Sequence, residues 1–301
     1  MTQLPSSSAE FSQRPAGSRA HARAAVLGHP IAHSLSPALH LAAYRSLGLD
    51  WSYEAVDLTE EQLAPWLEER GNEWVGVSLT MPLKEQVLPL LTAIDPGASQ
   101  VRAVNTVLFE EGRRRGFNTD ISGLAAAISD SCSLHDAEVV VLGGGATARS
   151  AIAAVAQLRE QGAGISRVVV CTRRPEAAIE LVSLAGEFQV TASIEPWPPT
   201  KPTLQGDLVV STVPAAASTQ LSHAVPAHPG VLVDVVYDPW PTPFASAWRE
   251  SGGKAVGGLE MLVHQAVGQV RLMTGRTVPA AILRAAGQAE LDRRGIAQAE
   301  Q

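Results

Sequence analysis

The sequence has only two cysteines, Cys132 and Cys171, and they form no C-x-x-C pair. Two isolated thiols supply neither a disulfide framework nor a thiolate zinc site, which excludes the small disulfide-rich and zinc-ribbon classes. No apolar run approaches the roughly 18 residues that span a bilayer. The N-terminal segment lacks the apolar centre of a signal peptide. We therefore expect a cytoplasmic protein without a membrane partner.

Positive charge is also scarce. The chain has 23 Lys and Arg residues against 30 Asp and Glu, a formal net charge of -7, and no long basic block. Nucleic-acid binding depends on clustered cations, so we expect no nucleic-acid partner. The negative net charge is compatible with binding of a small anionic ligand, because a local basic site can exist in an acidic protein. His29, His33 and His40 have no carboxylates at ligand spacing, and we expect no metal site.

The order of apolar segments indicates two domains. The chain has 301 residues, and single hydrophobic cores stop growing near about 250 to 300 residues. Residues 1–22 lack apolar periodicity and predict a disordered N-terminal extension. Over residues 23–120, strand-like runs alternate with helix-period segments and end in a hairpin at Gly112. A second alternating series over 121–258 has the fully apolar strands typical of a buried parallel sheet.

The predicted fold class is therefore α/β. We expect a substrate-binding domain with a mostly parallel sheet, formed by 23–120 and by helices over 259–295 that return to it. We expect a Rossmann-type nucleotide-binding domain over 121–258. The sequence does not distinguish a monomer from a homodimer.

A glycine-rich segment fits the G-x-G-x-x-A pattern between an apolar strand and an Ala-rich helix. It consists of Gly143, Gly144, Gly145, Ala146, Thr147 and Ala148. Backbone N–H groups of such a turn approach a diphosphate closely, and the helix N-terminus adds a positive dipole end. The alternative is a plain strand-to-helix turn, which the flanking pattern disfavours.

The end of the next apolar strand indicates which dinucleotide binds. NAD enzymes usually carry an acidic residue there, whereas this chain has Thr172, Arg173 and Arg174. Two guanidinium groups suit a 2′-phosphate, so NADP is the predicted cofactor. A solvated basic turn is the competing explanation for the same residues.

Polar residues at predicted strand ends are the candidates for chemistry. Ser34 and Ser36 precede a helix opened by Pro37, where Ser36 fits the N-cap position and hydroxyls with free N–H groups suit a carboxylate. Lys84 lies in the first turn of a helix opened by Pro82. A solvated surface lysine and ordinary turn propensity are the simpler explanations for each feature taken alone.

Together these segments resemble the shikimate dehydrogenase family, over about Ala24 to Arg284. The matching elements are G-x-P-I-x-H-S-x-S-P from Gly28 to Pro37, T-x-P-x-K from Thr80 to Lys84, A-V-N-T from Ala103 to Thr106, N-T-D-x-x-G from Asn118 to Gly123, the glycine loop from Gly143 to Ala148, D-x-x-Y from Asp234 to Tyr237, and G-x-x-M-L-x-x-Q-A from Gly258 to Ala266. The resemblance implies an NADP-dependent oxidoreductase that interconverts shikimate and 3-dehydroshikimate in aromatic amino acid biosynthesis.

The same resemblance implies roles for single residues. Lys84 and Asp120 flank the reacting hydroxyl as an acid/base pair, and the amine exchanges the hydroxyl proton. Shikimate is held by Ser34, Ser36, Thr80, Asn105, Asp120, Tyr237 and Gln265. Val235 and Gly258 lie near the nicotinamide, and Thr212 lies near the adenosine.

Four departures from the family pattern affect these expectations. Thr212, Val213 and Pro214 stand in place of a more usual T-S-x-G element, so the adenosine contacts can differ. Thr172 stands where the family usually has Asn, and Ser78 also replaces a usual Asn. Arg102 replaces a usual Gly, which puts the local backbone in question because Gly tolerates positive φ.

Two alternative functions stay open from the sequence. An NAD-preferring quinate/shikimate dehydrogenase would share the substrate residues, but Arg173 and Arg174 argue against NAD. A non-catalytic dinucleotide-binding sensor would be expected to have lost Lys84 or Asp120, and both are present.

Overall fold

The computed structural model describes residues 21–110 and 112–299. Residues 1–20 of the predicted extension lie outside the described residues. The prediction was wrong for His21 and Ala22, which begin strand β1 (His21–Gly28) and pair in register with Asp50 and Trp51 of strand β2 (Asp50–Asp57). These two residues are ordered by pairing with a neighbouring strand, although the local sequence has no periodic pattern of apolar residues.

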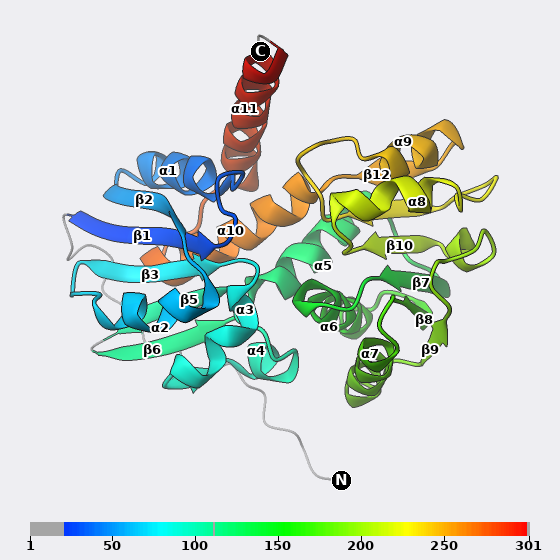
Figure 1. Cartoon of the computed structure of the whole chain (residues 1–301), viewed down its shortest axis with the longest axis horizontal. Coiled ribbons are helices and arrows are strands. Elements are labelled where there is room, and N and C mark those ends of the chain that lie inside the picture. Colours follow the sequence, from blue (N-terminus) through cyan, green and yellow to red (C-terminus); the bar gives the residue numbers. More distant parts are fainter. Residues whose placement is uncertain (1–20, 111, 300–301) are drawn as a thin grey trace.

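The first sheet is mixed. Besides β1 and β2 it contains β3 (Trp74–Leu79), β4 (Ala93–Ile94), β5 (Thr106–Glu110) and β6 (Arg113–Phe117). Its strand order is β2-β1-β3-β5-β6-β4 (Figure 1). Strands β1, β2 and β3 are parallel, β4 is parallel to β6, and β5 and β6 form the predicted antiparallel hairpin.

The second sheet is parallel at every pairing. Its strands are β7 (Ala137–Leu142), β8 (Ile165–Cys171), β9 (Ala192–Glu195), β10 (Leu208–Ser211), β11 (Val231–Asp234) and β12 (Lys254–Val256). They lie in the order β12-β11-β10-β7-β8-β9. The buried Val and Leu runs of β7 and β10 explain the fully apolar pattern, because helices cover both faces of this sheet.

Helices flank both sheets (Figure 1). They are α1 (Ser36–Ser46), α2 (Glu60–Glu68), α3 (Leu83–Gln86), α4 (Pro96–Gln100), α5 (Thr119–Ser131), α6 (Ala146–Glu160), α7 (Pro175–Glu187), α8 (Ser218–Ser222), α9 (Pro243–Glu250), α10 (Gly258–Thr274) and α11 (Ala280–Ala299), with 3-10 turns at Leu88–Leu90, Thr203–Gln205 and Ala215–Ala217. Among the described residues, no helix is both long and apolar enough to cross a membrane.

The C-terminal helices return to the first sheet, as predicted. Val270 of α10 and Leu283 of α11 share a core with Ala24 and Val26 of β1. Helix α5 lies between the two sheets and packs against both α6 and α10 (Figure 1). The fold is thus the expected two-domain α/β arrangement, while the predicted boundaries at residues 120 and 258 stay predictions.

Arg102 adopts the backbone conformation that its replacement of glycine put in question. Helix α4 ends in a Schellman motif, in which Ala103 N–H donates to Ala98 O (3.2 Å) and Arg102 N–H donates to Ser99 O (3.1 Å). The motif requires a left-handed residue, and Arg102 has φ 49°. The side chain is exposed. Arg102 therefore carries a local backbone cost that glycine would avoid.

We expect Arg102→Gly to raise the free energy of unfolding by about 0.5 to 1 kcal/mol. A left-handed non-glycine residue costs about 1 to 2 kcal/mol, and the greater chain entropy of glycine offsets part of the gain. Urea unfolding followed by circular dichroism measures the change. Arg102→Ala is the control, because it removes the guanidinium and keeps the backbone cost. Equal stabilisation by both variants would contradict the backbone explanation.

Candidate active site

Two adjoining cavities lie between the sheets. One of about 260 Å³ is lined mainly by the first sheet, α1 and α10, and one of about 700 Å³ is lined by the glycine loop and the loops after β8 and β10. We call them the substrate cavity and the cofactor cavity. Thr80, Lys84 and Thr147 line both. Lys84 therefore stands where the two cavities meet.

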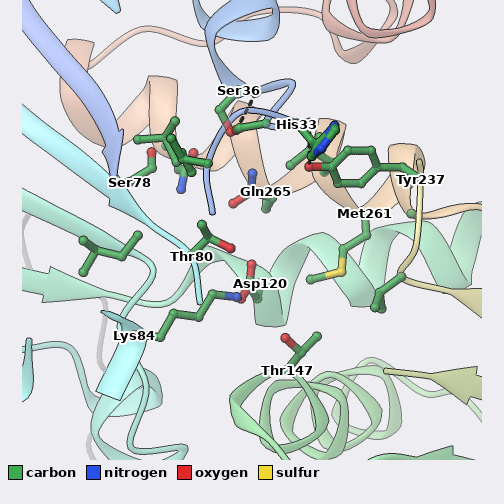
Figure 2. Close-up of a pocket in the computed structure, with 18 of the residues that line it drawn as sticks. His33, Ser36, Ser78, Thr80, Lys84, Asp120, Thr147, Tyr237, Met261 and Gln265 are labelled. Carbon is green, nitrogen blue, oxygen red and sulfur yellow. Dashed lines mark hydrogen bonds and ion pairs between the residues drawn. The ribbon is translucent and has the colours of Figure 1, made fainter. Parts of the chain in front are cut away.

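Lys84 and Asp120 are in direct contact. Lys84 Nζ lies 2.6 Å from Asp120 Oδ2, and the side chains are 15% and 4% exposed. Figure 2 shows the lysine extending from α3 toward the carboxylate at the start of α5. Residues 36 positions apart thus form one nearly buried ion pair that still opens to the cavity.

The first turn of α5 positions Asp120. Asn118 is the N-cap, and its Oδ1 accepts hydrogen bonds from Asp120 N–H (3.0 Å) and Ile121 N–H (3.3 Å). A carboxylate in the first helical turn is also favoured by the helix dipole. The Asn118 amide donates to Ala103 O and to Ser150 Oγ of α6, which ties the start of α5 to both sheets.

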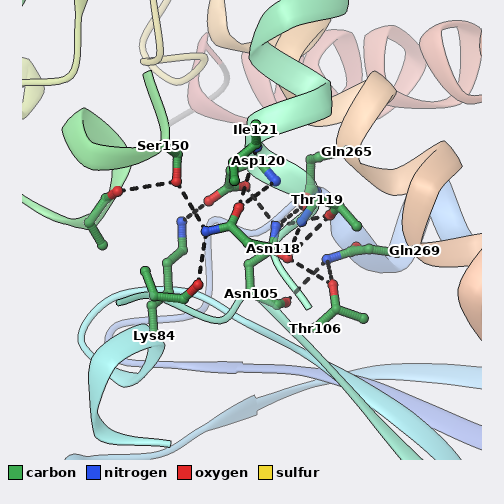
Figure 3. A network of polar contacts seen from close by, with 12 residues as sticks. Lys84, Asn105, Thr106, Asn118, Thr119, Asp120, Ile121, Ser150, Gln265 and Gln269 are labelled. Atoms are coloured by element: carbon green, nitrogen blue, oxygen red, sulfur yellow. Dashed lines mark hydrogen bonds and ion pairs between the residues drawn. The ribbon is translucent and has the colours of Figure 1, made fainter. Parts of the chain in front are cut away.

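Asn105 fixes the other oxygen of the carboxylate (Figure 3). Its Nδ2 donates to Asp120 Oδ1 at 2.7 Å and lies 3.1 Å from Gln265 Oε1. Its Oδ1 accepts from Thr119 N–H and from the Thr106 hydroxyl, both at 2.8 Å. Asn105 is 1% exposed, so this network is a rigid support for Asp120 rather than a flexible surface contact.

Helix α10 contributes two glutamines to the same network. Gln265 lines the substrate cavity, and its contact with a substrate stays a prediction. Gln269 also lines it and donates to Thr106 Oγ1 (3.1 Å) and Asn105 O (3.3 Å). Sequence reasoning missed Gln269, although a residue four positions after Gln265 lies on the same helix face. The four-residue spacing from Gln265 was the sequence signal that could have identified Gln269.

The two serines of the loop before α1 both line the substrate cavity, but their local roles differ from the prediction. The N-cap position of α1 is occupied by Leu35, and Ser36 already belongs to the helix. It is Ser34 whose Oγ accepts a hydrogen bond, from Ser36 N–H at 3.3 Å. The Ser36 hydroxyl is therefore not used to cap the helix.

Arg294 of α11 holds this serine loop from behind. Its guanidinium donates to His33 O (2.8 Å) and Ser34 O (3.1 Å). Tyr237, from the loop after β11, donates its hydroxyl to the same His33 carbonyl at 3.4 Å. Tyr237 thus lines the substrate cavity from the loop after β11, and its predicted contact with the substrate stays a prediction. Nothing in the local sequence indicated Arg294.

Thr80, Val235 and Gly258 are further lining residues of the substrate cavity, and Thr80 also lines the cofactor cavity. Figure 2 shows Thr80 beside Lys84 and Asp120. A Cβ on Gly258 would lie 2.0 Å from Val235 O, so only glycine allows this close approach. The predicted nicotinamide-side pair therefore lies on the same cavity as Lys84.

The glycine loop has the features of a phosphate cradle. Gly143 has φ +113°, and a Cβ there would lie 2.3 Å from Thr212 Oγ1, so the turn requires glycine. A Cβ on Gly145, in contrast, would meet nothing within 4 Å, which leaves that side open to the cofactor cavity. Helix α6 begins at Ala146 without a side-chain cap, so its first N–H groups are available to an anion.

The predicted adenosine and 2′-phosphate residues line the cofactor cavity together. They are Thr172, Arg173, Arg174 and Thr212. Both arginines are exposed, but they are not equivalent, because the Arg174 guanidinium donates to Gly144 O at 2.7 Å and no such bond is seen for Arg173 among the described residues. Thr212 donates to Leu142 O at 2.8 Å. Arg173 is thus the freer cation for a phosphate, and Arg174 also braces the glycine loop.

A further arginine links the two cavities structurally. Arg149 of α6 donates to Val101 O at 2.7 Å and forms a 2.8 Å ion pair with Glu85, the neighbour of Lys84. The helix that begins at the phosphate cradle is therefore attached to the helix that carries Lys84.

Asp234, at the end of β11, is a buried acid next to Val235. It is 1% exposed, and its carboxylate accepts from the Thr242 hydroxyl (2.9 Å) and Val236 N–H (3.3 Å). Burial raises the pKa of Asp234 to about 6, and these hydrogen bonds only partly oppose that rise.

Comparisons with known proteins agree with this geometry. The chain matches the shikimate dehydrogenase substrate binding domain over residues 26–107 and the shikimate 5′-dehydrogenase C-terminal domain over 258–286. It is 40% identical to an NADP-dependent shikimate dehydrogenase of Thermus thermophilus, over 84% of this chain and 92% of that protein.

Solved structures are similar over the same extent. Mycobacterium tuberculosis shikimate dehydrogenase superposes with a TM-score of 0.79 at 37% identity, covering 89% of this chain and 99% of that one. A shikimate 5-dehydrogenase of Thermus thermophilus, in complex with NADP(H) and shikimate, gives 0.76 at 36% identity, with 89% and 99% covered.

We expect the stability difference between the wild type and Asp234→Asn to depend on pH. The folded-state pKa lies above the unfolded value, so the aspartate contributes most stability below about pH 4 and loses it as pH rises to about 6. The free energy of unfolding of the variant should therefore rise relative to that of the wild type by up to about 3 kcal/mol over this pH interval. Urea unfolding at several pH values measures it, with exposed Asp50→Asn as control. A pH-independent difference would refute the expectation.

Proposed function

The chain belongs to the shikimate dehydrogenase family, and we propose that Lys84 and Asp120 carry out the proton transfer of its NADP-dependent reaction. The reaction interconverts shikimate and 3-dehydroshikimate in aromatic amino acid biosynthesis. The observation that carries the proposal is the 2.6 Å contact between Nζ and Oδ2 at the junction of the two cavities. An acid/base group must reach the hydroxyl of the carbon that faces the cofactor, and the junction of the two cavities is the place for it.

NADP, when bound, accepts or returns the hydride of the carbinol carbon. In the oxidation direction, the neutral amine of Lys84 accepts the proton of the reacting hydroxyl, so that a ketone and an ammonium form. Asp120 accepts a hydrogen bond from that ammonium and keeps it directed at the oxygen. In the reduction direction, the ammonium donates the proton back to the ketone oxygen. Atoms and charges balance without a metal ion.

The substrate carboxylate is assigned to the opposite end of the substrate cavity. Ser34 and Ser36 lie there beside the N-terminus of α1, and Figure 2 shows Ser36 on the far side of Gln265 from Lys84. Thr80, Gln265 and Tyr237 line the space between, which is assigned to the ring hydroxyls. Asn105 does not line the cavity and would act through Asp120 and Gln265, to which its amide is bonded. Hydroxyls and a helix N-terminus are suitable donors for a carboxylate.

The cofactor residues fit NADP. The open side of Gly145 and the uncapped start of α6 suit the diphosphate, with Ala146 and Thr147 in the first turn. Arg173 is exposed at the rim and suits the 2′-phosphate, and Arg174 lies next to it.

Two further points stay proposals. Cys132 and Cys171 are both free, which is compatible with the predicted cytoplasmic location. A monomer or a homodimer is expected. The NAD-preferring alternative is opposed by Arg173, and the sensor alternative by the Lys84 and Asp120 contact.

We expect Lys84→Met to lower kcat with shikimate and NADP by roughly 10² to 10⁴, with KM for shikimate changed by less than about threefold. The loss follows from removal of the proton acceptor while the binding residues stay in place. NADPH absorbance at 340 nm measures the rate. Lys201→Met, at an exposed lysine, is the matched control and should keep full activity. A Lys84→Met enzyme with normal kcat would remove Lys84 from the chemistry.

We expect the Arg173→Ala/Arg174→Ala double variant to raise KM for NADP at least tenfold and to leave KM for NAD nearly unchanged. Each lost charged hydrogen bond is worth about 1.5 to 3 kcal/mol. The assay pairs shikimate and quinate with each cofactor. Arg113→Ala/Arg114→Ala on the β5–β6 hairpin is the control. If KM for both cofactors rose equally, the 2′-phosphate assignment would be wrong, and a wild-type preference for quinate with NAD would favour the alternative enzyme.

A further inference from the structure

The wall of the substrate cavity contains a hydroxyl, Ser78, that is bound from behind by a buried phenol. Tyr53 lies on β2 and Ser78 on β3, with β1 between them. Tyr53 pairs with Ala24 and Ser78 with Val26, so all four side chains are on one face of the sheet. The small side chain of Ala24 lets the Tyr53 ring cross β1. Tyr53 then donates to Ser78 Oγ at 2.7 Å.

The donor direction determines what Ser78 can offer to a ligand. A hydroxyl has one hydrogen, and the Tyr53 phenol gives its hydrogen to Ser78 Oγ. Among the described residues, Ser78 Oγ donates its own hydrogen to no other group. Ser78 is 3% exposed and lines the substrate cavity. Its free O–H is thus available on the cavity side.

Neighbouring groups keep the Tyr53 phenol neutral and in place. Burial raises its pKa well above the ordinary value, so it stays an O–H donor at working pH. The His40 ring stacks on the Tyr53 ring with centroids 3.9 Å apart. His40 Nδ1 lies 2.9 Å from Ser36 O and must carry the hydrogen, and burial lowers the pKa of His40 to about 4, so the ring is neutral. The Ser36 hydroxyl also lies within hydrogen-bonding reach of the phenol.

We propose that Ser78 is a third hydroxyl donor, with Ser34 and Ser36, for the substrate carboxylate, and that Tyr53 is the positioning residue that turns the Ser78 hydrogen into the cavity. Figure 2 shows Ser78 and Ser36 on the same side of the cavity, away from Lys84. The inference rests on the proposed function, because it takes shikimate as the ligand. The proposal also gives a role to Ser78, which replaces the usual asparagine. The hydrogen bond from Tyr53 fixes the direction of the Ser78 hydroxyl, which would otherwise rotate freely.

The test compares Tyr53→Phe, Ser78→Ala and the double variant. Tyr53→Phe should raise KM and the calorimetric Kd for shikimate by about 3- to 10-fold, as expected for one neutral hydrogen bond. Its kcat and its KM for NADP should change by less than about twofold. The double variant should bind shikimate no more weakly than Ser78→Ala does, since Tyr53 acts through Ser78.

Tyr44→Phe is the matched control. Tyr44 is 1% exposed, belongs to the same core and donates its hydroxyl to Met273 Sδ at 3.7 Å. It should lose stability to a similar extent as Tyr53→Phe and keep the wild-type Kd for shikimate.

The outcomes distinguish a failure of the proposed function from a failure of the positioning role of Tyr53. If the wild type does not oxidise shikimate, the proposed function fails. If the wild type does oxidise shikimate, any of three results would overturn the positioning role. Tyr53→Phe could leave the Kd for shikimate unchanged, or it could change that Kd no more than Tyr44→Phe does. The effects of Tyr53→Phe and Ser78→Ala on Kd could also be fully additive in the double variant.

Discussion

The carboxylate of Asp120 is the constraint on which the geometry of the site depends. It is 4% exposed, and a buried charge is tolerated only when partners replace its water. Lys84 of α3 contacts Oδ2, and Asn105, just before β5, contacts Oδ1. Since the two partners come from different elements, a shift of either element against α5 would leave a buried oxygen without its hydrogen bond. Fixing one carboxylate therefore fixes the position of three segments.

The same constraint extends to the second sheet through α6. Asn118, which caps the helix of Asp120, donates to Ser150, and Arg149 pairs with Glu85 beside Lys84. Arg149 and Ser150 both lie within two helical turns of the phosphate cradle at the start of α6. Polar contacts between the sheets are directional, whereas apolar packing tolerates sliding. The position of Lys84 relative to the glycine loop is thus set by a few short hydrogen bonds around one helix end.

Features with a local physical cause were predictable from the sequence. The β5–β6 hairpin follows from strand runs around Gly112, and the phosphate cradle follows from glycines between a strand and a helix. The N-cap assignment of Ser36 was wrong, since Leu35 occupies that position. The contact of Arg294 with the serine loop, about 260 positions away, was missed because no local pattern indicates it. Tyr53 was missed for the same reason, since its hydroxyl acts across β1 on a residue of another strand.

The two cavities use different donors, and the ion pair explains why. Among the described residues that line the substrate cavity, Lys84 is the only lysine or arginine, and the opposite end offers hydroxyls. A guanidinium there would attract the Asp120 carboxylate at low dielectric and weaken its hold on Lys84. The cofactor cavity carries Arg173 and Arg174 farther from that carboxylate, where phosphates need full positive charge. Under the proposed function, neutral donors for the substrate would leave Lys84, the one amine among the described lining residues, paired with Asp120 alone.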